Sequence, residues 1–204
     1  MKFEYPPGST PLEPEELLGL IPVFISTQAE LNAAEQMNIA RAQAWLLKNK
    51  ISAMEVLDDF FLRELHERMY GDVWTWAGKY RQSDKNIGVD WTRIPIFLRD
   101  LLDDVKYQIE NKTYSEIEIA VRFHHRLVWI HLFPNGNGRH ARVLADFLLK
   151  KLNGGVFQWG GGDIRNYASA SEMRTKYISA LRLADKNNVQ PLIDFAVGQE
   201  WKIS

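Results

Sequence analysis

The sequence contains no cysteine. This absence excludes disulfide bonds, thiolate nucleophiles and cysteine-ligated zinc sites, and it fits a reducing compartment. No run of about 18 apolar residues occurs, so no membrane-spanning helix is expected. Residues 1–8 also lack the apolar stretch of a secretory leader. We therefore expect a cytoplasmic protein without a membrane partner.

An excess of charge of either sign is also missing. The chain has 25 basic and 26 acidic residues and a net charge of −1. This balance provides no overall attraction to phosphate backbones, so direct nucleic-acid binding is not expected. Hydrophobic residues at 46% and a length of 204 residues are typical of a single folded globular domain.

Proline is concentrated at one end of the chain. Five of the eight prolines lie within the first 22 residues. Because proline fixes φ and lacks an N–H, these positions exclude a continuous helix and predict an extended N-terminal arm over residues 1–25. Residues 26–50 are expected to form a helical region after the arm, and residues 51–204 are expected to form the core. The three parts together are expected to make one compact domain.

Apolar residues recur at helical spacing in most of the remaining chain. This spacing predicts helices over residues 28–50, 52–70, 92–111, 115–130, 139–152, 163–185 and 191–201. Ser52 and Glu55 have the spacing of a capping box. Within residues 74–91 the periodicity changes, and two short extended pieces about a turn predict a β-hairpin. The expected fold class is all-α, a helical bundle with a small β-hairpin flap and a proline-rich arm.

Residues 130–142, IHLFPNGNGRHAR, interrupt the helical pattern. A Gly-Asn-Gly turn between helices is most often only a turn, but here the following helix begins with two arginines. Glycines allow positive φ, and the free N–H groups of a helix N-terminus attract an anion, so the segment can hold phosphate. Arg139 and Arg142 share one helix face and can add forked donors. A neutral His131 at its edge can accept a proton from a hydroxyl.

The joint pattern resembles the Fic family signature, His-x-Phe-x-(Asp/Glu)-Gly-Asn-Gly-Arg-x-x-Arg. The matching residues are His131, Phe133, Gly136, Asn137, Gly138, Arg139 and Arg142. Residues 76–81, 123–127 and 177–185 resemble other parts of the same family, so the likeness covers about residues 26–195. The arm and the helix after it look like the subgroup called mobile mystery protein B, which is carried on bacterial mobile elements.

The resemblance implies a protein adenylyltransferase of the Fic fold. Such an enzyme moves AMP from ATP to a Tyr, Thr or Ser hydroxyl of a target protein, with His131 as the base. Phosphates would be bound by Asn135, Gly136, Asn137, Gly138, Arg139 and Arg142. The target would dock by strand addition on the flap residues Ser83, Asp84, Lys85, Asn86, Ile87 and Gly88.

The resemblance also implies bound Mg²⁺, which the family usually holds with an Asp or Glu at position 135. This chain has Asn135 there, and a neutral amide oxygen is a weaker ligand for a hard cation. Phe133 is implied to point into the core, and Asn137 to brace the loop.

Residues 26–32 resemble the inhibitory motif of self-inhibited Fic proteins, (Ser/Thr)-x-x-x-Glu-(Gly/Asn), although Leu31 departs from it. In that interpretation Glu30 pairs with Arg142 and takes the place of the γ-phosphate. Glu30 also has capping-box spacing from Thr27, so simple helix capping stays an equal alternative. Glu35 is the second candidate for the inhibitory carboxylate.

The remaining histidines have ordinary structural interpretations. We expect His66 at the surface, and His124, His125 and His140 on helix faces or in the core, because a metal site needs convergent ligands. Two other functions stay open: another Fic reaction, such as UMP transfer or AMP removal, and a weakly active interaction protein of a mobile element or toxin–antitoxin pair. A homo-oligomer is also left open.

Overall fold

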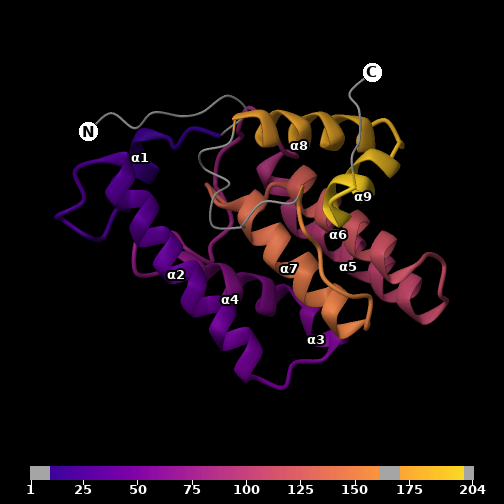
Figure 1. Cartoon of the computed structure of the whole chain (residues 1–204). Helices are drawn as coiled ribbons and strands as arrows, with labels where there is room; N and C mark the ends of the chain where they lie inside the picture. The colour runs from indigo at the N-terminus through magenta and orange to yellow at the C-terminus, as the bar shows by residue number, and fades with distance from the viewer. Residues whose placement is uncertain (1–9, 161–170, 200–204) are drawn as a thin grey trace.

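The computed structural model describes residues 10–160 and 171–199, and the regular secondary structure within these ranges is helical (Figure 1). The elements are α1 (Pro14–Leu17), α2 (Gln28–Lys48), α3 (Ala53–Val56), α4 (Asp59–Tyr70), the 3₁₀ turn η1 (Trp91–Arg93), α5 (Ile94–Glu110), α6 (Glu116–Ile130), α7 (Asn137–Lys151), α8 (Ser171–Ala184) and α9 (Gln190–Val197). The all-α fold class is confirmed. Parts of the predicted helices at 163–185 and 191–201 lie outside the described residues.

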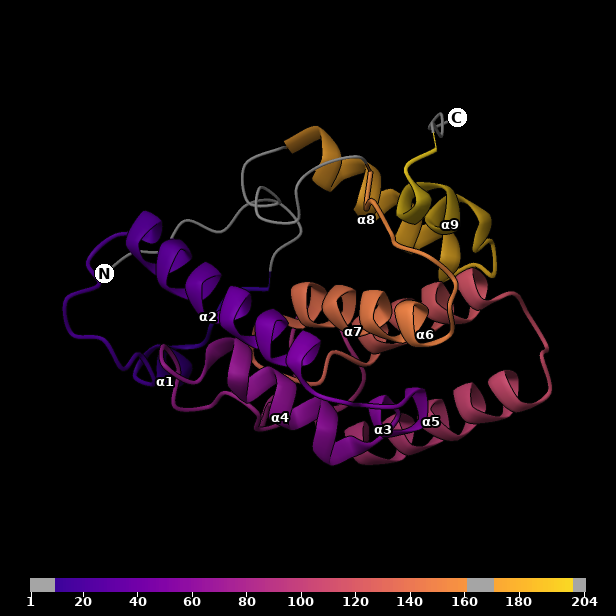
Figure 2. The same ribbon diagram turned by 60° about the horizontal axis from the view of Figure 1, so that its bottom comes forward.

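Helices α6 and α7 lie side by side at the centre of the molecule (Figures 1 and 2). Helices α2 and α4 pack together on one side, α5 lies along α6, and α8 and α9 cover the other side. The apolar faces of α6 and α7 are buried on both sides, with Phe123 and Leu144 fully inaccessible. Each such side chain contributes about 1.5–3 kcal/mol by leaving water. The central pair is therefore a stable support for the loop that joins it.

The helix predicted over residues 52–70 is in fact two helices. Ser52 and Glu55 form the expected capping box at the start of α3. The chain then leaves the helical region at Leu57, with φ −93° and ψ 48°, and the side chain of Asp58 accepts a hydrogen bond from the N–H of Phe61 at 3.2 Å. The sequence thus contained a second N-cap that the periodicity alone concealed.

The predicted β-hairpin flap is not formed. Residues 79–90 are bends and irregular backbone, and in the part of the chain that is described the isolated β-bridge joins Leu20 to Trp74 instead. The buried guanidinium of Arg81 donates to the carbonyls of Ser83 (2.8 Å) and Val89. These carbonyls therefore point inward to a side chain and are not available for pairing with an opposite strand. We call residues 82–89 the flap segment below.

The described part of the N-terminal arm is not fully extended. Pro14 begins the one-turn helix α1, where its missing N–H is no disadvantage. Beyond it, the N–H of Ile21 donates to the carbonyl of Val73 at 2.9 Å. Residues 1–9 lie outside the described range.

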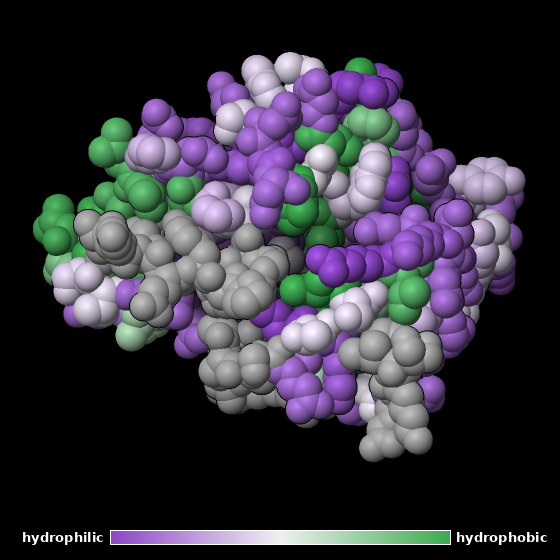
Figure 3. Space-filling view, turned by 90° about the horizontal axis from the view of Figure 1, so that it is seen from above, coloured by the Kyte–Doolittle hydropathy of each residue, from purple (hydrophilic) through white to green (hydrophobic). Residues whose placement is uncertain are grey.

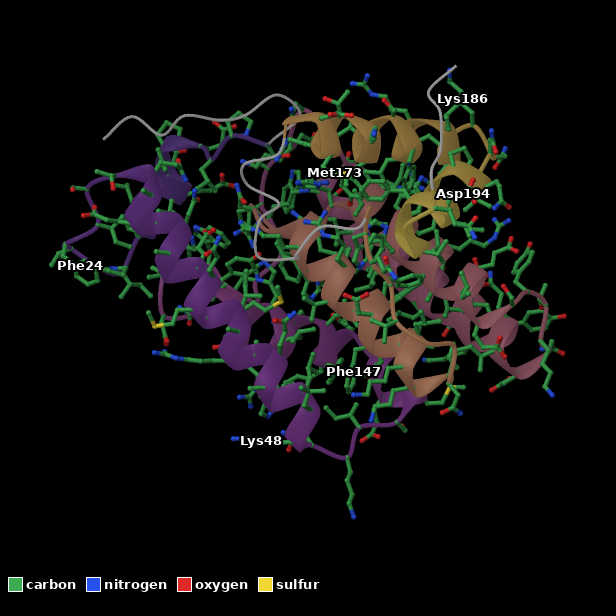
Figure 4. All side chains as sticks on the ribbon, in the orientation of Figure 1. Phe24, Lys48, Phe147, Met173, Lys186 and Asp194 are labelled. Atoms are coloured by element: carbon green, nitrogen blue, oxygen red, sulfur yellow. The ribbon has the colours of Figure 1, made fainter. Side chains whose placement is uncertain are left out.

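Apolar side chains gather at the outer edge of the loop that joins α1 to α2 (Figure 3). Leu18, Val23 and Phe24 are largely exposed, Val23 completely, and Phe24 stands away from the ribbon in Figure 4. Among the described residues, no helix has the length and apolar character needed to cross a membrane.

Candidate active site

His131 lies directly after the last residue of α6. Its backbone is left-handed (φ 59°, ψ 67°), and its N–H donates to the carbonyl of Leu127 at 3.1 Å. Residues other than glycine seldom adopt positive φ. At this position the left-handed conformation ends the helix and redirects the chain. The redirected chain places the His131 side chain in the wall of a cavity of about 480 Å³.

The imidazole of His131 is buried, and neither ring nitrogen has a hydrogen-bond partner within residues 10–160 and 171–199. Burial, together with the positive charges of Arg81 and Lys85, lowers the pKa of His131 to about 4, against a smaller opposing effect of the nearby Val128 backbone. The ring is therefore neutral at pH 7. A neutral imidazole with unbonded nitrogens in a cavity can accept a proton from a bound hydroxyl.

The loop after His131 is braced from inside. The amide of Asn137 accepts from the N–H of Phe133 at 2.9 Å and donates to its carbonyl at 2.7 Å. Phe133 itself is fully buried and stacks on the ring of His66, with 3.6 Å between the ring centroids. These contacts hold the backbone of the loop in one shape before any ligand binds.

Helix α7 begins in the cavity wall. Its N-cap is Gly136 (φ 79°), where a Cβ atom would lie 2.6 Å from the ring of Tyr70. No side chain caps this end of α7. The first N–H groups of a helix have no partner within the helix, and they carry the positive end of its dipole. Gly136, Asn137 and Gly138 line the cavity, so this helix end offers backbone donors to an anion.

Four arginines line the same cavity: Arg139 and Arg142 from α7, and Arg174 and Arg182 from α8. Arg142 lies over the ring of Tyr177 at 5.1 Å, and the Tyr177 hydroxyl is 3.0 Å from Nε2 of His124. Burial lowers the pKa of Arg174, and the nearby charges of Arg142 and Arg139 lower it further. Arg174 was missed by the sequence reasoning, because its approach depends on how α8 packs over the central pair. The concentrated positive charge suits a polyphosphate.

Glu35, and not Glu30, faces these arginines. One Glu35 oxygen pairs with Nη1 of Arg139 at 2.6 Å, and the other accepts from Nε1 of Trp74 at 2.8 Å. The Glu35 side chain is almost wholly buried, whereas that of Arg139 remains 34% exposed toward the cavity.

Glu30 closes the capping box of α2. Its Oε2 accepts from the N–H and hydroxyl of Ser26 (2.7 and 3.0 Å) and from the N–H of Thr27 (2.9 Å). The side chain is exposed and does not reach Arg142. The expected Glu30–Arg142 pair is therefore absent, because the capping bonds hold the carboxylate at the outer end of the helix.

The amide of Asn135 is engaged on both sides. Its Oδ1 accepts from the N–H of Gly136 at 2.7 Å, and its Nδ2 donates to the carbonyl of Thr10 at 3.2 Å. No group of three or more His, Cys, Asp or Glu side chains suited to a metal occurs among the described residues. Magnesium prefers several oxygen ligands and usually a carboxylate. The residues present therefore do not fit a protein-held Mg²⁺ at position 135.

The flap segment borders the cavity only near its end, where Ile87 and Gly88 line the wall and Gly88 lies beside His131. Lys85 does not line the cavity, and its side chain is 1% exposed and pairs with Glu16 of the arm at 2.6 Å. The remaining predicted docking residues, Ser83, Asp84 and Asn86, do not line the cavity.

His66 is fully buried, so the expectation of a surface position is wrong. Its Nδ1 accepts from the N–H of Gly78 at 3.0 Å, and its Nε2 donates to the carbonyl of Asn135 at 3.1 Å. Both ring nitrogens are thus satisfied, which offsets the cost of burial. His124, His125 and His140 are also buried, as expected for core residues of helices.

Comparisons with known proteins identify the kind of domain that carries this cavity. Residues 56–149, which run from α4 to near the end of α7 and include the braced loop, match the family model described as Fic/DOC family. The chain contains a Fic domain. Among curated proteins, it is 26% identical over 136 residues to the protein adenylyltransferase Fic of Drosophila virilis, which covers 65% of this chain and 26% of the relative. The chain thus spans about a quarter of the length of the curated relatives it matches.

Solved Fic structures share the fold. Fic-1 (residues 134–508) from C. elegans aligns with a TM-score of 0.67 at 20% identity, over 88% of this chain and 51% of that one. BepC from Bartonella tribocorum, solved with bound AMPPNP, aligns with a TM-score of 0.65 at 17% identity, over 91% and 97% of the two chains. These likenesses support a helical Fic fold around the cavity described above.

Proposed function

We propose that this protein is an adenylyltransferase that moves AMP from ATP to a Tyr, Thr or Ser hydroxyl of a target protein. The observation that carries the proposal is the cavity itself, whose wall combines an unbonded neutral imidazole, an uncapped helix N-terminus and a group of arginines. The names of the curated relatives and the AMPPNP bound in BepC support the choice of ATP.

In the proposed reaction the target oxygen attacks the α-phosphorus of ATP. The O–H proton passes to a ring nitrogen of His131, a new O–P bond forms, and the bond between the α-phosphorus and the bridging oxygen breaks, so that pyrophosphate leaves. The N–H groups of residues 137 and 138 bind the transferring phosphate, and Arg139 and Arg142 bind the leaving phosphates. Magnesium would accompany ATP as its counter-ion.

The experiment that tests the proposal compares ATP labelled at the α- and γ-phosphates, incubated with the protein and with cell lysate. Label on protein from α-labelled ATP alone is the expected result. His131→Ala should abolish the transfer and leave the affinity for nucleotide within about twofold of the wild-type value. The reason is that the imidazole is assigned to accept a proton and makes no hydrogen bond that holds the site together. Transfer at the wild-type rate in His131→Ala, or label from the γ-phosphate, would contradict the proposal.

We further propose that the α2 region restrains this activity through Glu35. The Glu35 carboxylate holds Arg139, one of the side chains proposed to bind ATP phosphates, at 2.6 Å. A bound phosphate must compete with this carboxylate for the same guanidinium. The labelling experiment should therefore be repeated in a Glu35→Gln background, where a weak wild-type signal would rise.

The same carboxylate supports one alternative, the removal of AMP from a modified protein. Glu35 lines the cavity that holds His131 and could orient a water molecule toward the α-phosphorus. In that case Glu35→Gln would lose AMP release from a labelled protein, whereas under the transfer proposal the same change gains labelling. The two functions thus predict opposite effects of one substitution.

A further inference from the structure

Arg81 is a buried arginine beside the candidate base. Its side chain is completely inaccessible, and its nearest acidic neighbour, Asp84, is 3.5 Å away and mostly exposed. Most buried arginines pair with a carboxylate, but here the strongest contacts are to backbone carbonyls. The guanidinium fork, with five donors in a fixed plane, is suited to holding several carbonyls at once.

The carbonyls it holds belong to the end of α6. Nε of Arg81 donates to the carbonyl of His131 at 2.7 Å, and Nη2 approaches that of Ile130 at 3.5 Å. The backbone N–H of Arg81 donates to the carbonyl of Leu132 at 3.0 Å. Three consecutive residues around the base are therefore bonded to this one arginine. Carbonyls at a helix C-terminus have no partner within the helix and carry its negative dipole end, so a cation there is stabilising.

This contact fixes the conformation from which the His131 ring reaches the cavity. A left-handed φ of 59° is unfavourable for histidine by about 1 kcal/mol, so something outside the residue must maintain it. The same guanidinium also bonds Ser83 and Val89, which places the flap segment against His131.

Gly88 shows how closely the flap segment approaches. Its φ is 102°, and a Cβ atom there would lie 2.7 Å from Cβ of His131 and 2.9 Å from Nη2 of Arg81. Any larger residue must push these groups apart. Arg81, His131 and Gly88 therefore form one interlocked unit, although they come from segments about 40 to 50 residues apart.

We propose that Arg81 is a positioning residue that sets the orientation of the His131 imidazole for proton transfer, by bonding the backbone of residues 130–132. The proposal rests on the role of His131 proposed above. Arg81 acts through His131 and does not line the cavity itself. Its charge also lowers the pKa of His131, which keeps the ring neutral in mildly acidic solution.

The test compares Arg81→Gln, Arg81→Lys and the control Arg63→Gln in steady-state transfer and in NMR titration of the His131 ring. Arg63 bonds a carbonyl of the same region, that of Gly78 at 3.1 Å, but does not touch His131. We expect kcat to fall about 100-fold in Arg81→Gln with KM for ATP unchanged, because a small misplacement of a catalytic group has that effect.

Arg81→Lys separates charge from geometry. It should keep the pKa of His131 near 4 because the charge remains. It should nevertheless lower kcat about 10-fold, because an ammonium lacks the fixed fork that bonds the carbonyls of both the α6 end and the flap segment. In Arg81→Gln the pKa of His131 should rise, which shifts the acid limb of the pH–rate profile to higher pH. Arg63→Gln should leave kcat, the His131 pKa and the profile unchanged.

Two further measurements keep the test decisive. If Arg81→Gln does not fold, Gly88→Ala displaces the same unit with Arg81 retained and should lower kcat with KM for ATP unchanged. If the wild-type protein transfers no AMP, the proposed function fails, but the NMR arm still decides whether Arg81 orients His131. A folded Arg81→Gln protein with wild-type kcat, or with unchanged His131 ring shifts and pKa, overturns the proposal.

Discussion

Glu30 and Glu35 lie on the same helix, five residues apart, in opposite environments. Glu30 is exposed at the first turn of α2 and bonds only groups of residues 26 and 27. Glu35 is buried one turn further along and joins α2 to α7 through Arg139, 104 residues away in sequence. The first contact is local and belongs to the helix itself, whereas the second exists only because the tertiary structure is formed.

This difference follows from helix geometry. At 3.6 residues per turn, a separation of five residues rotates a side chain by about 140° around the axis. The two glutamates therefore cannot face the same neighbour. Since Glu35 faces the cavity, Glu30 must face away from it, and only one of them can influence a bound phosphate.

The strongest test of this comparison is Glu35→Gln. A charge-assisted hydrogen bond contributes about 1.5–3 kcal/mol, so its removal should raise productive ATP binding roughly 10- to 100-fold. Trp74 can still donate to the amide oxygen of glutamine, which limits the loss of stability. The measurements are the rate of labelling from α-labelled ATP and the Kd for ATP.

An ATP affinity in Glu35→Gln no higher than in the wild-type protein would mean that the Glu35–Arg139 pair does not compete with phosphate. The gain should also be larger for ATP than for AMP, because Arg139 is assigned to the leaving phosphates. Equal gains for the two nucleotides would indicate that Glu35 acts through the general shape of the cavity.

A smaller effect is expected from Trp74→Phe. The indole N–H holds one oxygen of Glu35 and thereby directs the other oxygen at Arg139. Loss of one hydrogen bond of about 1 kcal/mol should loosen the pair and raise ATP affinity about fivefold. Because Trp74 is buried, the smaller ring also leaves a cavity, and thermal unfolding should show a lower melting temperature. Unchanged ATP affinity at a lowered melting temperature would limit the role of Trp74 to packing.

The sequence was a good guide to the helices and a poor guide to the flap. Helices α5, α6 and α7 have regular apolar periodicity, and their predicted positions are confirmed to within a few residues. The predicted hairpin is absent because the carbonyls of Ser83 and Val89 accept hydrogen bonds from the Arg81 guanidinium and not from an opposite strand. No local pattern in residues 82–89 encodes this contact. Propensity describes a segment by itself, and here a single buried cation decides its conformation.

The same distinction applies to the site. His131 and the arginines of α7 come from one continuous segment, so their proximity was predictable from spacing. The choice between Glu30 and Glu35 was not predictable from spacing. The motif match depends on the residues next to each glutamate, whereas the ion pair with Arg139 depends on how α2 lies against α7. His66 and Arg174 were missed for this reason too, since packing from other helices brings them to the loop and cavity.

The smallest effect in the comparison belongs to the α2 cap. Thr27→Ala removes the side-chain acceptor for the N–H of Glu30 and should cost about 1 kcal/mol, or about 2–4 °C in melting temperature. Glu30→Gln keeps an acceptor oxygen and loses only the charge, so its melting temperature should fall less. Neither change touches Arg139, and neither should alter labelling or ATP affinity.

Acid provides the last check on the role of Glu30. Hydrogen bonds from Ser26 and Thr27 hold the pKa of Glu30 below its ordinary value of 4.5. The stabilisation by the charged cap is therefore fully present above pH 4.5 and is lost as the pH falls through the lowered pKa of the folded state. The difference in melting temperature between the wild-type protein and Glu30→Gln should accordingly be present at pH 7 and disappear at strongly acidic pH. A gain in labelling by Glu30→Gln at pH 7 would instead indicate that Glu30 restrains the activity, and it would contradict the assignment of that role to Glu35.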